Sequence, residues 1–257
     1  MEFFHWVQVI LDSYGALLLK GTGVTILLAL VGTLAGFVIG LLIGIYKTLP
    51  ISKEDPLLKR ILYKIFNFIL SAYIELFRST PMMVQATVIF YGAAFMFGLR
   101  LDPVNAGMFI ISINTGAYMS EIVRGGIISV DRGQFEATHS IGMTHFQSML
   151  YIVLPQAIRN IMPALGNQFI INIKDSCVLS VISVTELFFQ TKSAAGATFQ
   201  TFPAYFIACV IYFVLCFGIT QLLRYLENKM DGADTYTIYG TEPVINGADT
   251  LKRGDVK

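Results

Sequence analysis

Residues 131–163 read DRGQFEATHSIGMTHFQSMLYIVLPQAIRNIMP, a polar, partly amphipathic stretch between segments that are apolar enough to span a membrane. Its second half has apolar residues at steps of three and four, which places them along one side of a helix. These residues are Phe146, Met149, Leu150, Val153, Leu154, Ala157, Ile158 and Ile161. Pro155 lacks an N–H and its ring crowds the preceding turn, so we expect a kink or break there. With Gly142 between the two halves, the pattern predicts two short helices that lie on a membrane face.

The composition of the whole chain is that of a membrane protein. Of its 257 residues, 55% are hydrophobic and 14% are charged, whereas a soluble domain has about 25% charged residues. Five stretches are long and apolar enough to cross a bilayer as helices. We therefore predict an all-α membrane protein with about five transmembrane helices. The net charge of +1 and the absence of a basic run give no indication of nucleic-acid binding, and membrane lipid is an expected partner.

Three regions are predicted along the chain. Residues 1–20 form an aromatic-rich, amphipathic lead-in at the membrane interface, 21–230 form the transmembrane domain, and 231–257 form a polar, disordered cytoplasmic tail. Within the transmembrane domain, four glycines spaced by four residues place a stripe on one face of the first span, where another helix can approach closely. The glycines are Gly32, Gly36, Gly40 and Gly44. Residues 190–202 are small and polar, which predicts a surface loop.

Two breaks are expected within the helical segments. An unbroken helix over residues 57–97 would be about 60 Å long, too long for one crossing. We therefore predict a helix on the cytoplasmic side, a bend near residues 79–81, and a span that ends near Phe97. The fourth span begins near Ala164 and contains Lys174 and Asp175 about halfway. Because residues 178–189 are β-branched and apolar, we expect a broken or partly re-entrant helix here.

The distribution of lysine and arginine predicts the topology. Five of these residues lie in 47–64 and five more follow position 223, whereas the opposite side has only Lys20, Arg100 and Lys192. Because cytoplasmic loops are enriched in positive charge, the amino terminus is expected outside. Residues 131–163 and the carboxyl terminus are expected in the cytoplasm.

The opening stretch resembles the EAA signature of ABC-importer permeases, E-A-A-x3-G-x9-I-x-L-P. Glu136, Ala137 and Thr138 are followed after three residues by Gly142, and after nine more by IVLP at 152–155. Thr138 stands where the signature usually has its second alanine. Residues 75–81 (ELFRSTP), 120–127 (SEIVRGGI) and 174–176 (KDS) resemble the polar-amino-acid branch of the same family. The resemblance implies a type I ABC importer permease fold in the cell membrane, with ATP-driven uptake of polar amino acids by alternating access.

The resemblance also implies partners. Two cytoplasmic ATPase subunits would each dock against one coupling helix, here about residues 134–143, with Glu136 in its first turn and Gly142 permitting the turn behind it. An extracellular solute-binding protein would deliver the solute, and a second permease subunit, a homodimer being favoured over a heterodimer, would complete the pathway. The candidate ATPase-coupling residues are Glu136, Ala137, Thr138, Gly142, Leu154 and Pro155.

No G-x-x-x-x-G-K-[ST] phosphate loop occurs in the sequence, so this chain is not expected to hydrolyse ATP by that route. The three histidines are dispersed and form no obvious metal or catalytic set. We therefore expect a transport subunit and not an enzyme, with no catalytic residue, metal or cofactor of its own. ATP and magnesium would be used by the partner ATPase.

Ionisable residues within the predicted spans mark a second candidate site, because charge at that depth is costly and usually lines a pathway or pairs. Lys174 and Asp175 would supply the cation and the acceptor that a zwitterionic amino acid needs, or would only fix the helix break. Their possible neighbours in the substrate pathway are Ser176, Gln85 and Glu186. The candidates for a structural or gate ion pair are Arg78, Glu121 and Arg124, with Glu121 pairing with either arginine.

Three alternatives remain open from the sequence. The chain could be an ABC permease for another small solute, because the EAA-like stretch marks the machinery and not the cargo. It could be an ion-coupled secondary transporter or channel that uses Glu121, Lys174 or Asp175 for protons or ions. It could also be a membrane scaffold or sensor that binds a partner without moving a solute.

Overall fold

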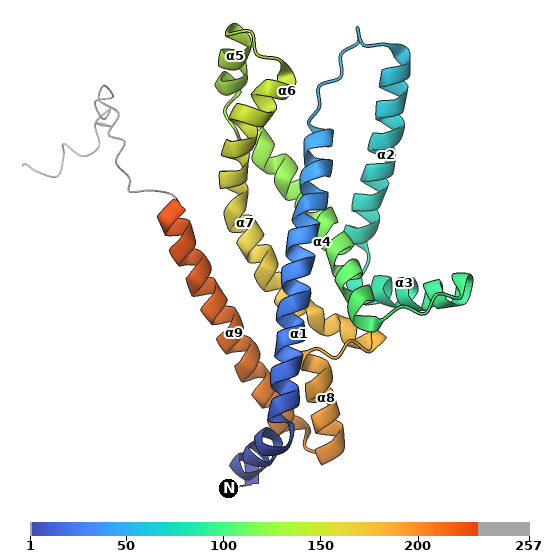
Figure 1. Ribbon diagram of the computed structural model, residues 1–257, viewed down its shortest axis with the longest axis vertical. Coiled ribbons are helices and arrows are strands. Elements are labelled where there is room, and N and C mark those ends of the chain that lie inside the picture. Colours follow the sequence, from blue (N-terminus) through green and yellow to red (C-terminus); the bar gives the residue numbers. More distant parts are fainter. Residues whose placement is uncertain (1, 231–257) are drawn as a thin grey trace, which may run out of the picture.

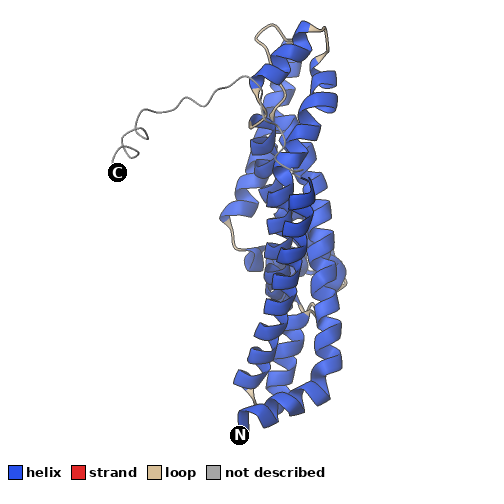
Figure 2. Cartoon of the chain, turned by 90° about the vertical axis from the view of Figure 1, so that its left-hand side faces the viewer, coloured by secondary structure: helices blue, strands red, loops and turns tan. Residues whose placement is uncertain are grey.

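The computed structural model describes residues 2–230, which form an elongated helical bundle with no strand in that range (Figures 1 and 2). The predicted disordered tail at 231–257 lies outside the described residues. The first helix, α1 (Glu2–Lys47), includes the predicted lead-in, and the last is α9 (Thr201–Met230). Within the described residues these two are long and apolar enough to cross a membrane singly, and the bent pair α2 (Leu57–Ser79) and α3 (Met82–Phe97) could make a third crossing.

The glycine stripe of α1 packs directly against α4 (Pro103–Ile128). A Cβ added at Gly32 would lie 2.7 Å from Ile111 Cγ2, and one at Gly36 would lie 2.6 Å from Thr115 Cγ2. Gly40 and Gly44 meet Met119 and Val123 of α4 in the same way. The predicted packing role of the stripe is therefore confirmed, and its partner is a helix of the same chain.

Replacing Gly36 by Leu is expected to destabilise the α1–α4 pair, because the new side chain has no room beside Thr115. Overpacking of this kind costs about 1–3 kcal/mol, so the thermal unfolding midpoint of the detergent-solubilised protein should fall by several degrees. Gly23→Leu is the matched control, because nothing lies within 4 Å of a Cβ at Gly23 in the same helix. Equal midpoints for the two variants would show that the stripe is not a packing surface.

The predicted bend between residues 79 and 81 is confirmed, with an angle of 112° between α2 and α3. Figure 1 shows α2 running along the long axis of the bundle and α3 lying across it, an arrangement in which α2 is better placed than α3 to cross a membrane. Two polar side chains of α2 contact neighbouring helices: Tyr73 donates a hydrogen bond to the Ile113 carbonyl of α4, and Ser71 accepts one from Lys47 of α1.

The second half of the opening stretch is not a short surface helix, and this part of the prediction was wrong. After α5 (Arg132–Ser140), α6 (His145–Ser148) passes through a π-helical turn (Met149–Val153) into α7 (Leu154–Asp175), which enters the bundle. The helix does not break at Pro155. The Leu154 N–H donates to the Met149 carbonyl five residues back, and this wider turn accommodates the proline ring without a clash.

Two further segments follow α7. The fourth span is broken as expected, and the structure places the break after Asp175, where α7 ends and a 3₁₀ segment (Ser176–Ile182) follows. The predicted loop at 190–202 was wrong: most of it belongs to α8 (Leu187–Thr198). Ala194 and Ala195 are buried in a cluster with Ile10 and Leu18 of α1, so small residues here provide close helix packing and not a flexible loop.

Candidate functional site

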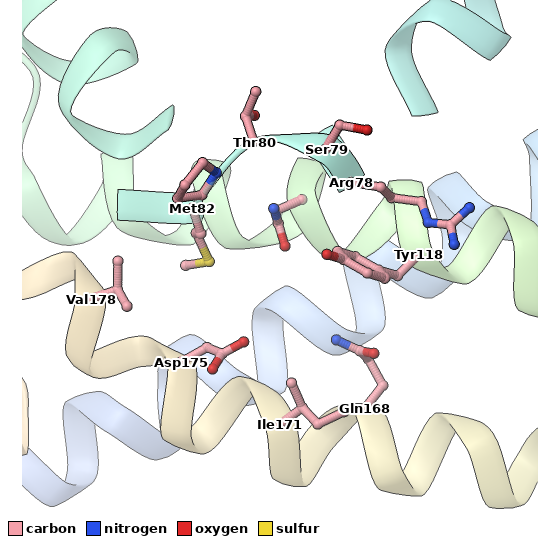
Figure 3. Close-up of a pocket in the computed structure, with 11 residues that line it drawn as sticks. Arg78, Ser79, Thr80, Met82, Tyr118, Gln168, Ile171, Asp175 and Val178 are labelled. Atoms are coloured by element: carbon pink, nitrogen blue, oxygen red, sulfur yellow. The ribbon is translucent and has the colours of Figure 1, made fainter. Parts of the chain in front are cut away.

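A cavity of about 570 Å³ lies where the bend between α2 and α3 faces α4 and α7 (Figure 3). It is lined by two charged residues, five neutral polar residues and four apolar ones. The polar and charged residues are Arg78, Ser79, Thr80, Asn114, Tyr118, Gln168 and Asp175; the apolar residues are Pro81, Met82, Ile171 and Val178. Four separate parts of the chain therefore build one site.

Hydrogen bonds from Gln85 hold the bend in place. Its side-chain amide donates to the carbonyls of Phe77 and Thr80 at 2.9 and 2.8 Å, and its oxygen accepts a 2.9 Å bond from Asn114. The first two carbonyls lie at the end of α2 and in the bend, where no helical N–H is available to them. Gln85, a predicted neighbour of the substrate, is thus buried behind the cavity and positions Asn114 on its wall.

Arg78 and Asp175 face the cavity from opposite sides. In Figure 3, Arg78 comes from the end of α2 and lies over the ring of Tyr118, with 5.7 Å between its guanidinium carbon and the ring centroid. Asp175 is the last residue of α7, and its side chain points into the cavity. Within residues 2–230 neither side chain makes a hydrogen bond to protein or a salt bridge, so both charges are available to a ligand.

The structure does not bring Lys174 and Asp175 together as a binding pair. Consecutive residues of an α-helix point about 100° apart, and Lys174 is exposed and does not line the cavity. Ser176 is buried and donates a 2.8 Å bond to the Ile173 carbonyl. The cation that faces Asp175 across the cavity is Arg78, which we had grouped with the ion-pair candidates.

Glu186 has a structural position away from the cavity. It is fully buried at the start of α8, where its carboxylate accepts bonds from the N–H groups of Phe188 and Phe189 at 2.8 and 2.7 Å. The hydroxyl of Tyr212 in α9 donates a third bond at 3.2 Å. Glu186 therefore caps α8 and fastens it to α9, and it does not line the cavity proposed for substrate.

Replacing Glu186 by Ala is expected to loosen α8, because two backbone N–H groups and the Tyr212 hydroxyl lose their acceptor. Loss of a helix cap costs about 0.5–2 kcal/mol, so amide hydrogen exchange across residues 187–198 should accelerate by about tenfold. Asp102→Ala, which removes the exposed cap of α4, is the control and should leave exchange in α8 unchanged. Unaltered exchange in the Glu186 variant would contradict the capping role.

A second charged cluster joins three helices nearer the end of the bundle that carries α5. Arg124 donates to Glu121 at 2.8 Å, and the ammonium group of Lys47 lies 3.9 Å from the other carboxylate oxygen. Lys47 also donates to Ser71 of α2 at 3.1 Å. Of the two pairings that we considered for Glu121, the structure contains the one with Arg124, and Lys47 extends it to α1.

The helix α5 and the turn behind it form the exposed tip of the molecule (Figure 1). Glu136 and Ala137 are exposed on α5, whereas Thr138 is buried. Burial at position 138 favours a small side chain, such as the threonine found here or the alanine usual in the signature. We expected Glu136 in the first turn of α5, but it is the fifth residue of the helix. The negative charge at the amino-terminal end of α5 comes from Asp131, which caps the helix by accepting a 2.6 Å hydrogen bond from the Gly133 N–H. Gly142 adopts a φ of +80°, which L-residues rarely adopt.

The remaining coupling candidates lie at the start of α7. Leu154 is its first residue and Pro155, which is exposed, its second. Beneath the tip, His145 stacks on Phe135 of α5 with 6.0 Å between the ring centroids. Partial burial, and to a lesser degree the nearby His139, lower the pKa of His145. This stack ties α5 to the helical path that leads into the bundle.

The elongated helical bundle has apolar helices that can cross a membrane, a cavity lined by polar residues, and the exposed helix α5 at one end. Together these features are those of a membrane transport subunit. The family described as binding-protein-dependent transport system inner membrane components matches residues 57–232. The chain therefore belongs to this family, and its prediction as an ABC-importer permease is confirmed.

Individual relatives agree with this assignment. The chain is 34% identical over 215 residues to the glutamine transport system permease protein GlnP of Escherichia coli, covering 83% of this chain and 93% of that protein. It is 31% identical over 225 residues to the probable glutamine ABC transporter permease protein GlnM of Bacillus subtilis, covering 88% and 98%.

Solved structures give the same fold. A crystal structure of an amino acid ABC transporter with histidines matches with a TM-score of 0.75 and 36% identity, covering 86% of this chain and 97% of that one. An inward-facing structure of the MetNI methionine ABC transporter matches with a TM-score of 0.63 at 20% identity, which supports the fold alone. The all-α fold predicted from the sequence is confirmed over the described residues.

Proposed function

We propose that this permease carries an uncharged polar amino acid, such as glutamine, into the cytoplasm through the cavity between Arg78 and Asp175. The observation that carries the proposal is the presence of one cation and one carboxylate, both without a protein partner in the described residues, on opposite walls of the same 570 Å³ cavity. The E. coli and B. subtilis relatives are named as glutamine permeases, which supports the choice of cargo.

The chemistry of the cavity matches an amino-acid zwitterion. The planar guanidinium of Arg78 can bind the substrate α-carboxylate through two parallel hydrogen bonds, and Asp175 can accept from the α-ammonium group. Among the described residues that line the cavity, Arg78 and Asp175 are the only charged ones. The side chain of the substrate then meets neutral groups such as Asn114, Tyr118 and Gln168. A charged side chain would remain uncompensated there, which is costly away from water.

The proposed arrangement in the membrane uses five spans: α1, α2, α4, α7 with the 3₁₀ segment, and α9. Among the described helices, α1 and α9 are apolar enough to cross a membrane singly and α4 and α7 are not, which is compatible with a position of α4 and α7 in the interior of an assembly. Figure 1 shows α5 and α6 at one end of the bundle and the amino terminus at the other. With the positive-inside prediction, α5 and the carboxyl terminus face the cytoplasm.

The proposed complex contains two cytoplasmic ATPase subunits, which bind ATP and magnesium and dock against α5, one on each permease subunit. A solute-binding protein docks at the opposite, extracellular end. The second permease subunit is proposed to be another copy of this chain, because one chain supplies both a complete substrate cavity and a complete α5 tip. Binding of ATP by the ATPase subunits, followed by its hydrolysis and the release of ADP and phosphate, would switch the cavity between the two sides of the membrane.

Calorimetric titration of amino acids into the detergent-solubilised permease–ATPase complex tests the cargo, because it separates this cavity from the solute-binding protein. We expect glutamine to bind, and glutamate and lysine to bind at least about tenfold more weakly, since burying an unpaired charge costs more than 1.4 kcal/mol. Equal binding of the charged amino acids, or binding only of a solute that is not an amino acid, would contradict the proposal.

A further inference from the structure

Two hollows adjoin at the corner between the end of α1 and the start of α2, far from the Arg78–Asp175 cavity. One has a volume of about 630 Å³ and is mainly apolar; it is lined by Tyr46, Leu49, Ile51, Pro56, Leu58, Lys59, Leu62, Tyr63 and Phe66. The other has a volume of about 260 Å³ and is basic; it is lined by Ile51, Ser52, Lys53, Arg60, Tyr63 and Lys64. Ile51 and Tyr63 line both hollows, so the two are continuous.

The apolar hollow has a fixed aromatic wall and an open side. Tyr46 stacks on Tyr63 with 5.2 Å between centroids, and Phe66 meets the Tyr46 ring edge-to-face at 4.9 Å. On the open side, Leu58 and Leu62 are 68% and 57% exposed. Exposed leucines beside a rigid aromatic wall suit the flexible hydrocarbon chain of a lipid.

The basic hollow has unbalanced positive charge. Lys53, Arg60 and Lys64 line it, and none of the described residues that line it is a carboxylate. The carboxylate of Asp55 lies beside the hollow and has two partners already: one oxygen pairs with Lys59 at 2.7 Å and the other accepts from the Ser52 N–H at 2.9 Å. Arg60 donates one bond to the Lys53 carbonyl at 3.5 Å, which holds its guanidinium beside the hollow. Three cations around a small recess favour a phosphate group.

We propose that this corner, formed by both hollows, binds one anionic phospholipid, with the phosphate in the basic hollow and an acyl chain in the apolar one. A free phosphate or nucleotide would use the basic part alone and leave the larger apolar part without a ligand. The bound lipid would brace α2, whose other end carries Arg78, and would thereby steady one wall of the amino-acid cavity.

Native mass spectrometry of the permease–ATPase complex, titrated with dioleoyl phosphatidylglycerol or dioleoyl phosphatidylcholine, tests this site. We expect the phosphatidylglycerol to bind at least about tenfold more tightly. In a Lys53→Gln/Arg60→Gln/Lys64→Gln variant the preference should disappear, since each cation near a membrane surface contributes about fivefold to binding of anionic lipid. The single variant Lys64→Gln, which changes one exposed side chain, should bind phosphatidylglycerol about fivefold more weakly than the unchanged protein.

The matched control is Lys20→Gln/Arg100→Gln/Lys192→Gln, which removes three exposed cations elsewhere on the chain and should retain the preference. Equal losses in the two triple variants, or equal binding of the two lipids by the unchanged protein, would overturn the site. In a last experiment, soluble glycerol phosphate competes with phosphatidylglycerol for the site. If it displaces the lipid at comparable concentrations, the apolar hollow contributes nothing and the assignment to a phospholipid is wrong.

Discussion

Replacing Asp175 by Asn is expected to lower glutamine uptake by about 30-fold or more. The substrate ammonium would lose the one carboxylate in the cavity and remain unpaired beside a neutral amide. Removing one partner of a desolvated charge pair costs about 2–5 kcal/mol, which corresponds to about 30-fold at the lower limit. The measurement is initial uptake rate in proteoliposomes, with calorimetric binding of glutamine as the second readout. Arg78→Gln should give a loss of similar size, since it removes the partner of the substrate carboxylate.

The control for both variants is Lys174→Gln. Lys174 is the immediate neighbour of Asp175, but unlike Asp175 it does not line the cavity. Uptake should therefore stay within about twofold of the unchanged protein. Loss of uptake in Lys174→Gln with retention in Arg78→Gln would restore the pair predicted from the sequence and reject the cavity assignment.

Replacing Gly142 by Val is expected to reduce docking of the ATPase by about tenfold. Gly142 has a φ of +80° at the end of the α5 tip, and a β-branched residue there costs about 1–3 kcal/mol of backbone strain. The turn contains the bonds from the Gly142 N–H to His139 and from the Met143 N–H to Thr138, both at 3.0 Å. Distortion of this turn would displace the exposed face of α5. Co-purification of the ATPase with the tagged permease measures the effect.

Gly98→Val provides a control with the same strain in a different place. Gly98 has a φ of +65° at the end of α3, and nothing lies within 4 Å of a Cβ added there, as is also true of Gly142. If the α5 tip is the docking site, Gly98→Val should lower stability but retain the ATPase. Full co-purification of the ATPase with the Gly142→Val variant would contradict the assignment of the α5 tip as the ATPase-docking site.

The features that the sequence predicted correctly depend on spacing along one segment. The glycine stripe, the bend at residues 79–81 and the break in the fourth span each follow from a local pattern with a direct physical meaning. The family was indicated in the same way, by the distances from Glu136 to Gly142 and on to Pro155.

The errors arose where packing between distant segments decides the outcome. The composition of residues 190–202 suits a loop as well as a closely packed helix, and burial of Ala194 and Ala195 against α1 selects the helix. The π-helical turn that accommodates Pro155 has no sequence pattern that we recognised. The five neutral polar side chains that line the cavity were missed as site residues, namely Ser79, Thr80, Asn114, Tyr118 and Gln168. Isolated polar residues in apolar segments were the available signal, but their convergence depends on the bend held by Gln85.

ATP-driven accumulation of glutamine tests the central claim most directly. Proteoliposomes would contain this chain with its co-purified ATPase, the solute-binding protein on the outside, and ATP with magnesium in the lumen next to α5. We predict accumulation above the external concentration only when ATP is present, and its loss with Asp175→Asn. Accumulation without the ATPase, driven instead by a proton or sodium gradient, would contradict the account and identify an ion-coupled transporter.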